Sequence, residues 1–393
     1  MVQVQRRTHR TRHLLAVSCA ALAAATLAAC GSSSGASGAS TTPSTQTSSS
    51  GSGSNQSAGL QAVVDKAMIA PTSIPLTTPL KSAPPNGKTI VYLQCEVAQC
   101  KEGGEGVQQA TSALSWTLKS IPFKSTDPST LNSAFQQALQ LKPLAVIIAG
   151  IPEVLWKGQE AAYQQAGIPI IPFFVGPIDL SSTVIANIGN LNDNAYFGKV
   201  LADWFIVDSG GKGDALVANV PAYQVLTSVS DAFEKEVASQ CAACKLKKLD
   251  VTATQLGTGA FSSVIISALQ KDPSIKYVMA TDGVFIDPLP AALAGAGLGG
   301  TVKVIAQGGD AQNIIDLKAD RLAALTGLPT IYAGWLSVDV AIRHYEGMSM
   351  PSDGGDGGVP TQLLTKASVG SVTGAFELPT DFRDQIKKLW LLG

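Results

Sequence analysis

The residues best suited to covalent chemistry in this sequence are its six cysteines. Four of them form two close pairs, Cys95 with Cys100 and Cys241 with Cys244. In an exported chain such closeness favours two local disulfides, Cys95–Cys100 and Cys241–Cys244. Two other uses of these thiols stay open. One is a structural zinc site, and the other is thiol–disulfide exchange at the C-x-x-C sequence of residues 241–244.

The surroundings of these cysteines weigh against both alternatives. A redox C-x-x-C begins a helix after a strand, whereas residues 241–244 follow an expected helix at 223–240. The two pairs also belong to different expected halves of the chain, which disfavours a shared zinc ion. The sequence has three histidines, which form no cluster: His9, His13 and His344. It therefore predicts no catalytic residue, no metal ion and no cofactor, and we do not expect an enzyme.

The first thirty residues predict export and a lipid anchor. Four arginines between positions 6 and 12 precede an apolar run at 14–29, an order typical of a secretory signal peptide. The run is short for a membrane span. The sequence Leu-Ala-Ala-Cys-Gly at 27–31 resembles the lipobox of bacterial lipoproteins, in which the cysteine is acylated after cleavage. Residues 1–29 would then be the signal peptide, and Cys30 would anchor the mature chain at the outer face of the cell membrane. The export route stays open.

Composition separates a tether from a globular part. Residues 30–59 are almost wholly Gly, Ser, Ala and Thr and carry no charge, so we expect a flexible tether. Residues 60–87 form an N-terminal extension without an assigned role. Removal of the four signal-peptide arginines would change the formal net charge from −1 to about −5. A mildly acidic chain without basic clusters disfavours nucleic acid as a partner.

From residue 88 onward, short apolar runs alternate with amphipathic stretches. The runs predict strands buried on both faces, and the stretches predict the helices that cover them. The expected strands are at 89–93, 119–123, 144–148, 168–171, 215–219, 245–254, 275–280, 302–306, 322–326 and 362–368. The expected helices are at 106–116, 131–141, 154–166, 194–207, 223–240, 262–271, 289–296, 311–319 and 331–346. This order predicts an α/β fold with two doubly wound parallel-sheet lobes and a ligand site at the carboxyl ends of the strands.

Four local sequences are informative together with this order of elements: Asp-Asn-x-x-x-Gly-Lys-x-x-x-Asp at 193–203, Asp-Pro-Ser-Ile-Lys-Tyr-Val-Met-Ala-Thr-Asp at 272–282, Val-Lys-Val-Ile-Ala-Gln-Gly-Gly at 302–309, and Leu-Thr-Gly-Leu-Pro at 325–329. With these sequences, the order of elements from residue 88 to about 372 resembles the type I periplasmic solute-binding proteins, especially their ribose-binding and repressor-related sugar group.

The resemblance implies that three crossovers join the lobes, near 188–191, 327–330 and 352–358. It places the first lobe at 88–190 with 328–350 and the second at 191–327 with 359–375, followed by a C-terminal helix or tail at 376–393. It also implies that the lobes close on a ligand and dock to a membrane permease.

The resemblance also shows which positions bind sugars in this family, and this chain has different residue types at several of them. An Asp-Arg pair of the sugar binders falls on Phe174 and Val175, an aspartate falls on Gly308, and an arginine falls near Thr227. Asp282 stands where the family has an asparagine and keeps a hydrogen-bonding side chain. A pocket with fewer charged groups holds a ring of hydroxyls less well, so we expect a ligand with an apolar portion.

The candidate ligand-binding residues follow strands or lie in the loop that the first disulfide would clip. They are Gln94, Glu96, Gln99, Phe174, Tyr223, Thr227, Asp282, Gln307 and Thr326. We expect a monomeric substrate-binding lipoprotein of an ABC-type importer whose partner is a membrane permease. A ligand-binding sensor without a permease and, less favoured, a thiol–disulfide oxidoreductase that uses Cys241 and Cys244 are the alternatives.

Overall fold

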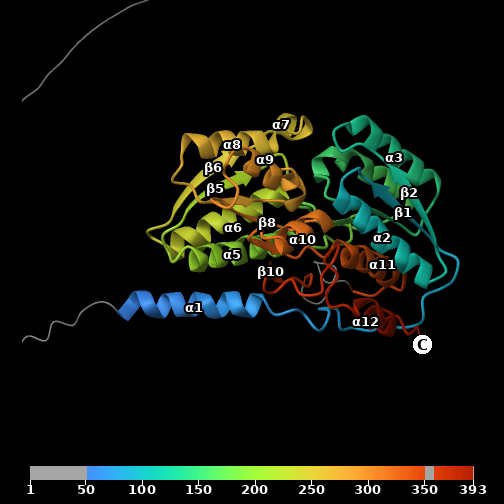
Figure 1. Cartoon of the computed structure of the whole chain (residues 1–393). Helices are drawn as coiled ribbons and strands as arrows, with labels where there is room; N and C mark the ends of the chain where they lie inside the picture. The colour runs from blue at the N-terminus through green and yellow to red at the C-terminus, as the bar shows by residue number, and fades with distance from the viewer. Residues whose placement is uncertain (1–50, 350–357, 393) are drawn as a thin grey trace, which may run out of the picture. The chain divides into compact units, whose positions relative to one another are not determined.

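The structure, a computed structural model, describes residues 51–349 and 358–392, with side chains from residue 58 onward. The expected signal peptide, Cys30 and most of the loop at 352–358 lie outside these residues. Two β-sheets, each covered by helices on both faces, make up most of the described chain (Figure 1). This is the doubly wound architecture that the alternation of apolar and amphipathic segments predicts.

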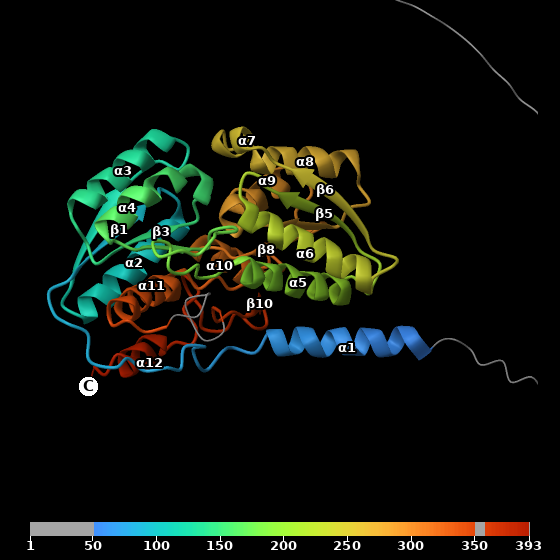
Figure 2. The same ribbon diagram turned by 180° about the vertical axis from the view of Figure 1, so that it is seen from behind.

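The first sheet has four parallel strands in the order β2-β1-β3-β4. Its strands are β1 (Thr89–Gln94), β2 (Thr117–Pro122), β3 (Ala145–Ala149) and β4 (Ile170–Phe173). Helices α2 and α11 pack against each other on one face, while α3 and α4 lie on the other (Figure 2). These helices are α2 (Ala98–Ala113), α3 (Pro128–Gln140), α4 (Glu160–Ala166) and α11 (Thr330–Tyr345). Every residue of β3 and β4 is buried. Strand β3 is central, and bridges from Ile170 to Val184 and from Phe173 to Ile188 cover the outer edge of β4.

The second sheet has six strands in the order β10-β9-β8-β7-β5-β6. All neighbours are parallel except β10, which pairs antiparallel with β9 at the sheet edge. The strands are β5 (Asp214–Asn219), β6 (Lys245–Asp250), β7 (Tyr277–Ala280), β8 (Lys303–Gln307), β9 (Ala324–Thr326) and β10 (Leu363–Thr365). Helices α5 and α6 lie on one face and α8 and α9 on the other (Figure 2).

Side-chain caps fix two of the helix starts in the second lobe. Asn190 and Asp193 form a capping box at the start of α5, and Asp310 and Asn313 form another at α10. Each box satisfies backbone N–H groups that have no partner inside the helix. The helices of this lobe are α5 (Leu191–Asp208), α6 (Gln224–Gln240), α7 (Ala253–Gly257), α8 (Phe261–Lys271), α9 (Leu289–Gly295) and α10 (Ala311–Lys318).

Between β4 and β10 the chain passes from one lobe to the other three times. The first passage follows β4 at residues 174–190, and the second follows β9 at 327–329. The third joins α11 to β10 and includes residues outside the described ranges. After β10, helix α12 (Phe382–Leu389) returns to the first lobe, where Trp390 stacks on Trp335 of α11 with ring centroids 5.4 Å apart.

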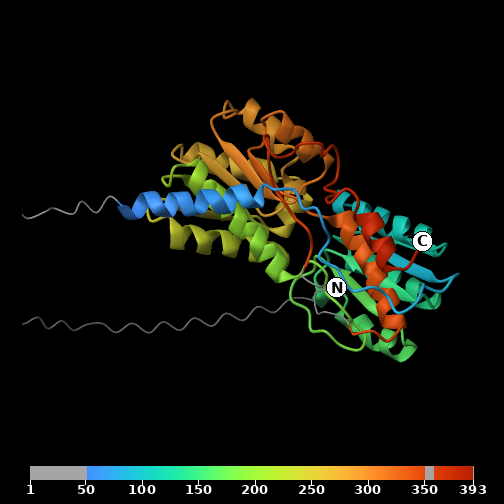
Figure 3. The same cartoon turned by 90° about the horizontal axis from the view of Figure 1, so that it is seen from below.

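Residues 60–87 contact both lobes, a role that the sequence does not suggest. Leu60 and Val64 of α1 (Gly51–Ala67) belong to the core on the α5 face of the second sheet, whereas Leu76 and Leu80 belong to the core of the first lobe. Figure 3 shows the segment after α1 running from the second lobe towards α12. Residues 60–87 therefore form a strap across the two lobes.

Four local expectations need correction. Residues 51–59, expected in the tether, are helical in α1, because Leu60 and Val64 fix that helix on the second lobe. Helix α2 starts eight residues before the expected 106 because its glycines allow close packing against α11, an advantage invisible to helix propensity. The expected helix at 154–166 is interrupted by two short 3₁₀ turns, η1 (Glu153–Leu155) and η2 (Lys157–Gln159). The expected strand at 245–254 ends at Asp250, because a capping box at Thr252 starts α7.

In the part of the chain that the structure describes, no helix combines the length and the apolar character needed to cross a membrane.

Candidate ligand-binding site

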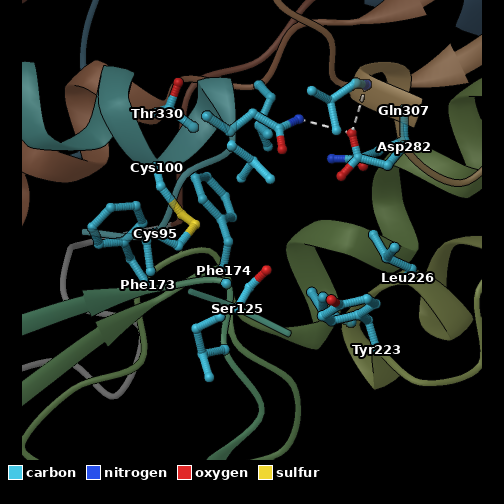
Figure 4. A pocket seen from close by; sticks show the side chains of 18 of the residues that line it. Cys95, Cys100, Ser125, Phe173, Phe174, Tyr223, Leu226, Asp282, Gln307 and Thr330 are labelled. Carbon is cyan, nitrogen blue, oxygen red and sulfur yellow. Dashed lines mark hydrogen bonds between the residues drawn. A yellow bond between two sulfur atoms is a disulfide. The ribbon is translucent and has the colours of Figure 1, made fainter. Parts of the chain in front are cut away.

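A cavity of about 100 Å³ lies between the two sheets, and residues from both lobes line it (Figure 4). It lies beyond the carboxyl ends of the strands, where doubly wound sheets bind ligands. Its wall is mostly apolar and includes Ile151, Phe173, Phe174, Leu226, Phe285 and Leu328. Its polar lining residues are Gln99, Ser125, Asn194, Tyr223, Asp282, Gln307 and Thr330. Asp282 is the one acidic side chain among the lining residues, and Lys, Arg and His are absent from them.

The Cys95–Cys100 disulfide is present and forms part of the cavity wall. It closes the turn between β1 and α2, and the Tyr92 hydroxyl donates a hydrogen bond to the Cys100 carbonyl oxygen at 2.7 Å. Gln99 lies inside this clipped turn and points across the cleft. The covalent closure thus constrains the turn that carries Gln99, which hydrogen-bonds to the opposite lobe.

Phe174 follows β4 and adopts an unusual backbone conformation with φ +49°. Bulky side chains seldom adopt this left-handed region because of steric conflict with the backbone. Its ring packs on Gly189, where an added Cβ would come within 2.2 Å of a ring carbon. Phe173 and Phe174 both line the cavity, and their rings pack edge to face with their centroids 5.9 Å apart. Strained residues are frequent at functional sites.

Asp282 links the two lobes. It follows β7, and its Oδ1 accepts a hydrogen bond from Gln99 Nε2 at 2.7 Å and another from the Val284 backbone N–H at 3.1 Å (Figure 4). Burial raises the pKa of Asp282 to about 6, and the nearby Asp310 carboxylate also raises it, whereas the Gln99 hydrogen bond lowers it. The Gln99–Asp282 hydrogen bond joins α2 of the first lobe to the second lobe, so the two lobes are in direct contact beside the cavity.

Gln307 ends β8, the strand next to β7, and only 2 % of its surface is exposed. Its Oε1 has no hydrogen-bond partner among the described residues. Buried polar atoms without partners are uncommon and need an explanation. Because Gln307 lines the cavity, a bound molecule is a suitable partner for this oxygen.

Four candidate residues do not line the cavity. Gln94 lies under α2, where its Oε1 would be 2.8 Å from an added Cβ at Gly104. Glu96 accepts hydrogen bonds from the N–H and the hydroxyl of the lining residue Ser125. Thr227 is one position beyond the lining residue Leu226, and a helix turns by about 100° per residue. Thr326 accepts a hydrogen bond from the Gly308 N–H at 3.3 Å instead.

Two residues of the first lobe form a polar pair that the sequence does not reveal. Thr330, the first residue of α11, lines the cavity and donates a hydrogen bond to Glu102 Oε2 at 2.7 Å. Burial raises the pKa of Glu102 to about 7, despite the Thr330 hydrogen bond. Pro329 before Thr330 marks a helix start, but only the tertiary packing of α11 on α2 brings Glu102 to it.

The second disulfide, Cys241–Cys244, is also present. Its position in the fold differs from that of a redox-active C-x-x-C sequence. Cys241 is the C-terminal cap of α6. The negative end of a helix dipole disfavours a thiolate, whereas reactive C-x-x-C cysteines lie at the positive end. Within the described residues no group of three or more His, Cys, Asp or Glu side chains is arranged to hold a metal ion.

The model of the periplasmic binding protein domain family matches residues 99–349 of this chain. The chain belongs to that family. The match includes the cavity residues from Gln99 to Thr330 and covers most of both lobes. No curated protein matches the chain.

Solved structures of solute-binding proteins share the fold. One from Agrobacterium vitis, bound to α-D-tagatopyranose, has 18 % identity and a TM-score of 0.63, with 72 % of this chain and 97 % of that chain covered. One from Agrobacterium radiobacter in complex with D-arabinose has 20 % identity and a TM-score of 0.63, with 73 % and 97 % covered. A 5-methylthioribose transporter solute-binding protein from Thermotoga lettingae, in complex with 5-methylthioribose, has 18 % identity and a TM-score of 0.63, with 81 % and 95 % covered. At this identity the likeness shows a type I periplasmic binding protein fold.

Loss of the first disulfide is expected to weaken ligand binding. In the double variant Cys95→Ser/Cys100→Ser, the turn that carries Gln99 gains freedom that binding must then remove. We expect a several-fold lower affinity by titration calorimetry, together with a stability loss of roughly 2 kcal/mol for so short a loop. Cys241→Ser/Cys244→Ser is the matched control, because that bridge is remote from the lining residues. An equal loss of affinity in both variants would contradict this role of the Cys95–Cys100 turn.

Proposed function

We propose that this protein is the lipid-anchored, extracytoplasmic solute receptor of an ABC-type importer, and that it binds its substrate without transforming it. The family match supports a solute-binding role. The cavity between the lobes carries the proposal, because residues of both sheets surround it and Gln99 and Asp282 hydrogen-bond across it. A ligand enclosed in this way stabilises the closed arrangement over an open one.

The lining of the cavity supports a ligand with an apolar portion and few polar groups. Phe174 occupies a position where the sugar binders carry a charged group, and the carboxylate of Asp282 is the single negative charge of the lining. The solved relative that binds 5-methylthioribose illustrates that this fold accepts a small molecule with an apolar substituent. We therefore propose a small ligand with an apolar or aromatic part, oriented by Asp282, Gln99 and Gln307.

A thermal-shift screen over sugars, polyols, nucleosides, amines and aromatic acids tests the binding role. A true ligand raises the unfolding temperature with its concentration, because it binds only the folded state. Small-angle scattering with and without that ligand then reports closure of the lobes. Failure of every compound class to stabilise the protein would contradict the receptor function.

Anchoring by Cys30 is a separate prediction. The Cys30→Ala variant should leave the membrane fraction and appear in the soluble or secreted fraction, because its acylation site is gone. Cell fractionation with immunoblotting measures this. Persistence of Cys30→Ala in the membrane fraction would show that another segment holds the protein there.

The permease partnership can be tested by transport. Cells that lack this protein should lose high-affinity uptake of the radiolabelled ligand, and the wild-type gene should restore it. Normal uptake without the protein, combined with normal ligand binding in vitro, would favour the alternative of a sensor that has no permease.

A further inference from the structure

Three polar side chains that line the cavity already use their donor hydrogens inside the protein. The Ser125 hydroxyl donates to Glu96 at 2.7 Å and the Thr330 hydroxyl donates to Glu102 at 2.7 Å. The Asn194 amide donates to the backbone carbonyls of Gly189 and Asn190. The donor hydrogens of these three lining residues are therefore committed to the protein, and their remaining capacity towards a ligand is that of acceptors.

Two further acceptors lie on neighbouring strand ends of the second lobe. Asp282 uses Oδ1 for both of its observed hydrogen bonds, with Gln99 and Val284, which leaves Oδ2 for another donor. Gln307 Oε1 is buried without a partner among the described residues. Figure 4 shows both side chains opposite the aromatic rings of the first lobe. A ligand that satisfies these oxygens must bring hydrogen-bond donors.

The charged side chains around the cavity also leave a negative charge without a partner of opposite sign. The lining contains one carboxylate and no Lys, Arg or His. The adjoining outer groove, a hollow of about 530 Å³ that includes Gly150 and Tyr223, contains Lys157. Lys157 is already paired with Glu153 at 2.7 Å and with Glu160 at 3.3 Å. An anionic ligand would therefore lack a counter-charge, whereas a cation would compensate the buried carboxylate of Asp282.

We propose that the ligand carries a protonated amine next to its apolar portion, and that the ammonium group donates hydrogen bonds to Asp282 Oδ2 and Gln307 Oε1. An ammonium group has three donors and no acceptor, which suits the open Oδ2 of Asp282 and the remaining acceptor capacity of the Ser125 and Thr330 hydroxyls. The rings of Phe174 and Tyr223 supply aromatic surface, and aromatic surface attracts cations. This inference rests on the proposed receptor function and specifies the class of its ligand.

The pKa of Asp282, raised to about 6 by burial and by Asp310, gives the inference a pH signature. Burial and the nearby Glu96 and Asp282 carboxyls raise the pKa of the Tyr223 phenol, so Tyr223 stays neutral. Near pH 7.5 Asp282 is mostly ionised and binds the ammonium group. At pH 5.0 it is mostly protonated, and amine affinity should be roughly tenfold lower, one power of ten per pH unit below the pKa.

Matched probes test the charge of the ligand. Benzylamine, benzyl alcohol and benzoate share one ring, and isobutylamine with isobutanol and 2-phenylethylamine with 2-phenylethanol give two further pairs. By titration calorimetry at pH 7.5 we expect the best amine to bind roughly ten- to a hundredfold tighter than its alcohol, the range for a hydrogen bond to a charged group. Benzoate should not bind.

Two variants test whether Asp282 causes the preference for amines. Asp282→Asn should abolish the preference of amine over alcohol and the pH dependence. Asp287→Asn should keep both, because Asp287 accepts a hydrogen bond from Asn313 and does not line the cavity. The amine inference is overturned if alcohols or plain pentoses bind as tightly as amines, or if Asp282→Asn keeps the preference. In those cases the receptor function stands, whereas failure of all compound classes in the thermal-shift screen overturns both.

Discussion

Replacement of Asp339 by alanine is expected to lower the free energy of unfolding by about 3–5 kcal/mol, the cost of leaving a buried charge without its partner. Asp339 and Arg343, one turn apart on α11, form a buried ion pair in which Nε and Oδ2 are 2.6 Å apart. Their side chains are 0 % and 3 % exposed. In Asp339→Ala the guanidinium group would remain buried without its carboxylate.

This ion pair also holds three segments together. The Trp390 indole N–H donates to Asp339 Oδ1 at 2.8 Å, which ties the C-terminal tail to α11. Arg343 Nη2 donates to the Thr78 carbonyl oxygen at 2.6 Å, which ties the strap of residues 60–87 to the same helix. Because α11 begins with the cavity residue Thr330, this cluster supports the wall of the site from the far end of the helix.

Urea denaturation measures the effect as a lower midpoint with an unchanged slope. Asp384→Ala is the matched control, because Asp384 forms an exposed ion pair with Lys387 at 3.2 Å and its side chain is 79 % exposed. Such pairs contribute at most about 1 kcal/mol. A loss below 1 kcal/mol in Asp339→Ala would show that the buried cluster adds little to stability.

Replacement of Gly106 by valine is expected to cost about 3 kcal/mol and to weaken ligand binding. A Cβ at Gly106 would lie 2.2 Å from the Ile331 carbonyl oxygen of α11, and a Cβ at Gly334 would lie 2.4 Å from the Gly103 carbonyl oxygen. The two helices meet backbone to backbone, so a larger side chain must push them apart. Overpacking of a close contact costs about 1–3 kcal/mol.

The effect on binding follows from what these helices carry. Helix α2 presents Gln99, and α11 presents Thr330. Displacement of either changes the cavity wall, so we expect titration calorimetry to show weaker binding in Gly106→Val. The control is Gly59→Val in α1, where an added Cβ meets nothing within 4 Å. Equal stability and affinity in both variants would contradict the close-packing explanation.

The sequence alone predicts the two-lobed α/β fold, because parallel strands that are buried on both faces consist of continuous apolar residues. Strands such as β3 and β4, with every residue buried, stand out from their surroundings. The bounds of single helices are predicted less well, because tertiary contacts can outweigh the intrinsic helix propensity of the residues. The glycines of α2 discourage a helix by themselves, and the Ser/Gly-rich start of α1 was expected to be flexible.

The candidate site could be located only approximately from the sequence, because strand ends show which residues lie near the cleft but not which way they point. Gln99, Phe174, Tyr223, Asp282 and Gln307 were singled out and do line the cavity. The sequence also indicates Gln94, Glu96, Thr227 and Thr326, but none of these four residues lines the cavity. Side-chain direction depends on helix phase and on partners distant in the chain.

The residue types of this protein determine the close cysteine pairs and the apolar strands. Only the tertiary structure shows that Gln99 and Asp282, 183 residues apart, hydrogen-bond across the lobes. Only the folded chain shows which donors are already used, because Ser125 and Thr330 donate to carboxylates of the first lobe. A hydrogen bond needs two groups that lie close together in the folded chain. The residues that line a pocket therefore indicate its ligand only when the structure shows which of their donors and acceptors are already bonded within the protein.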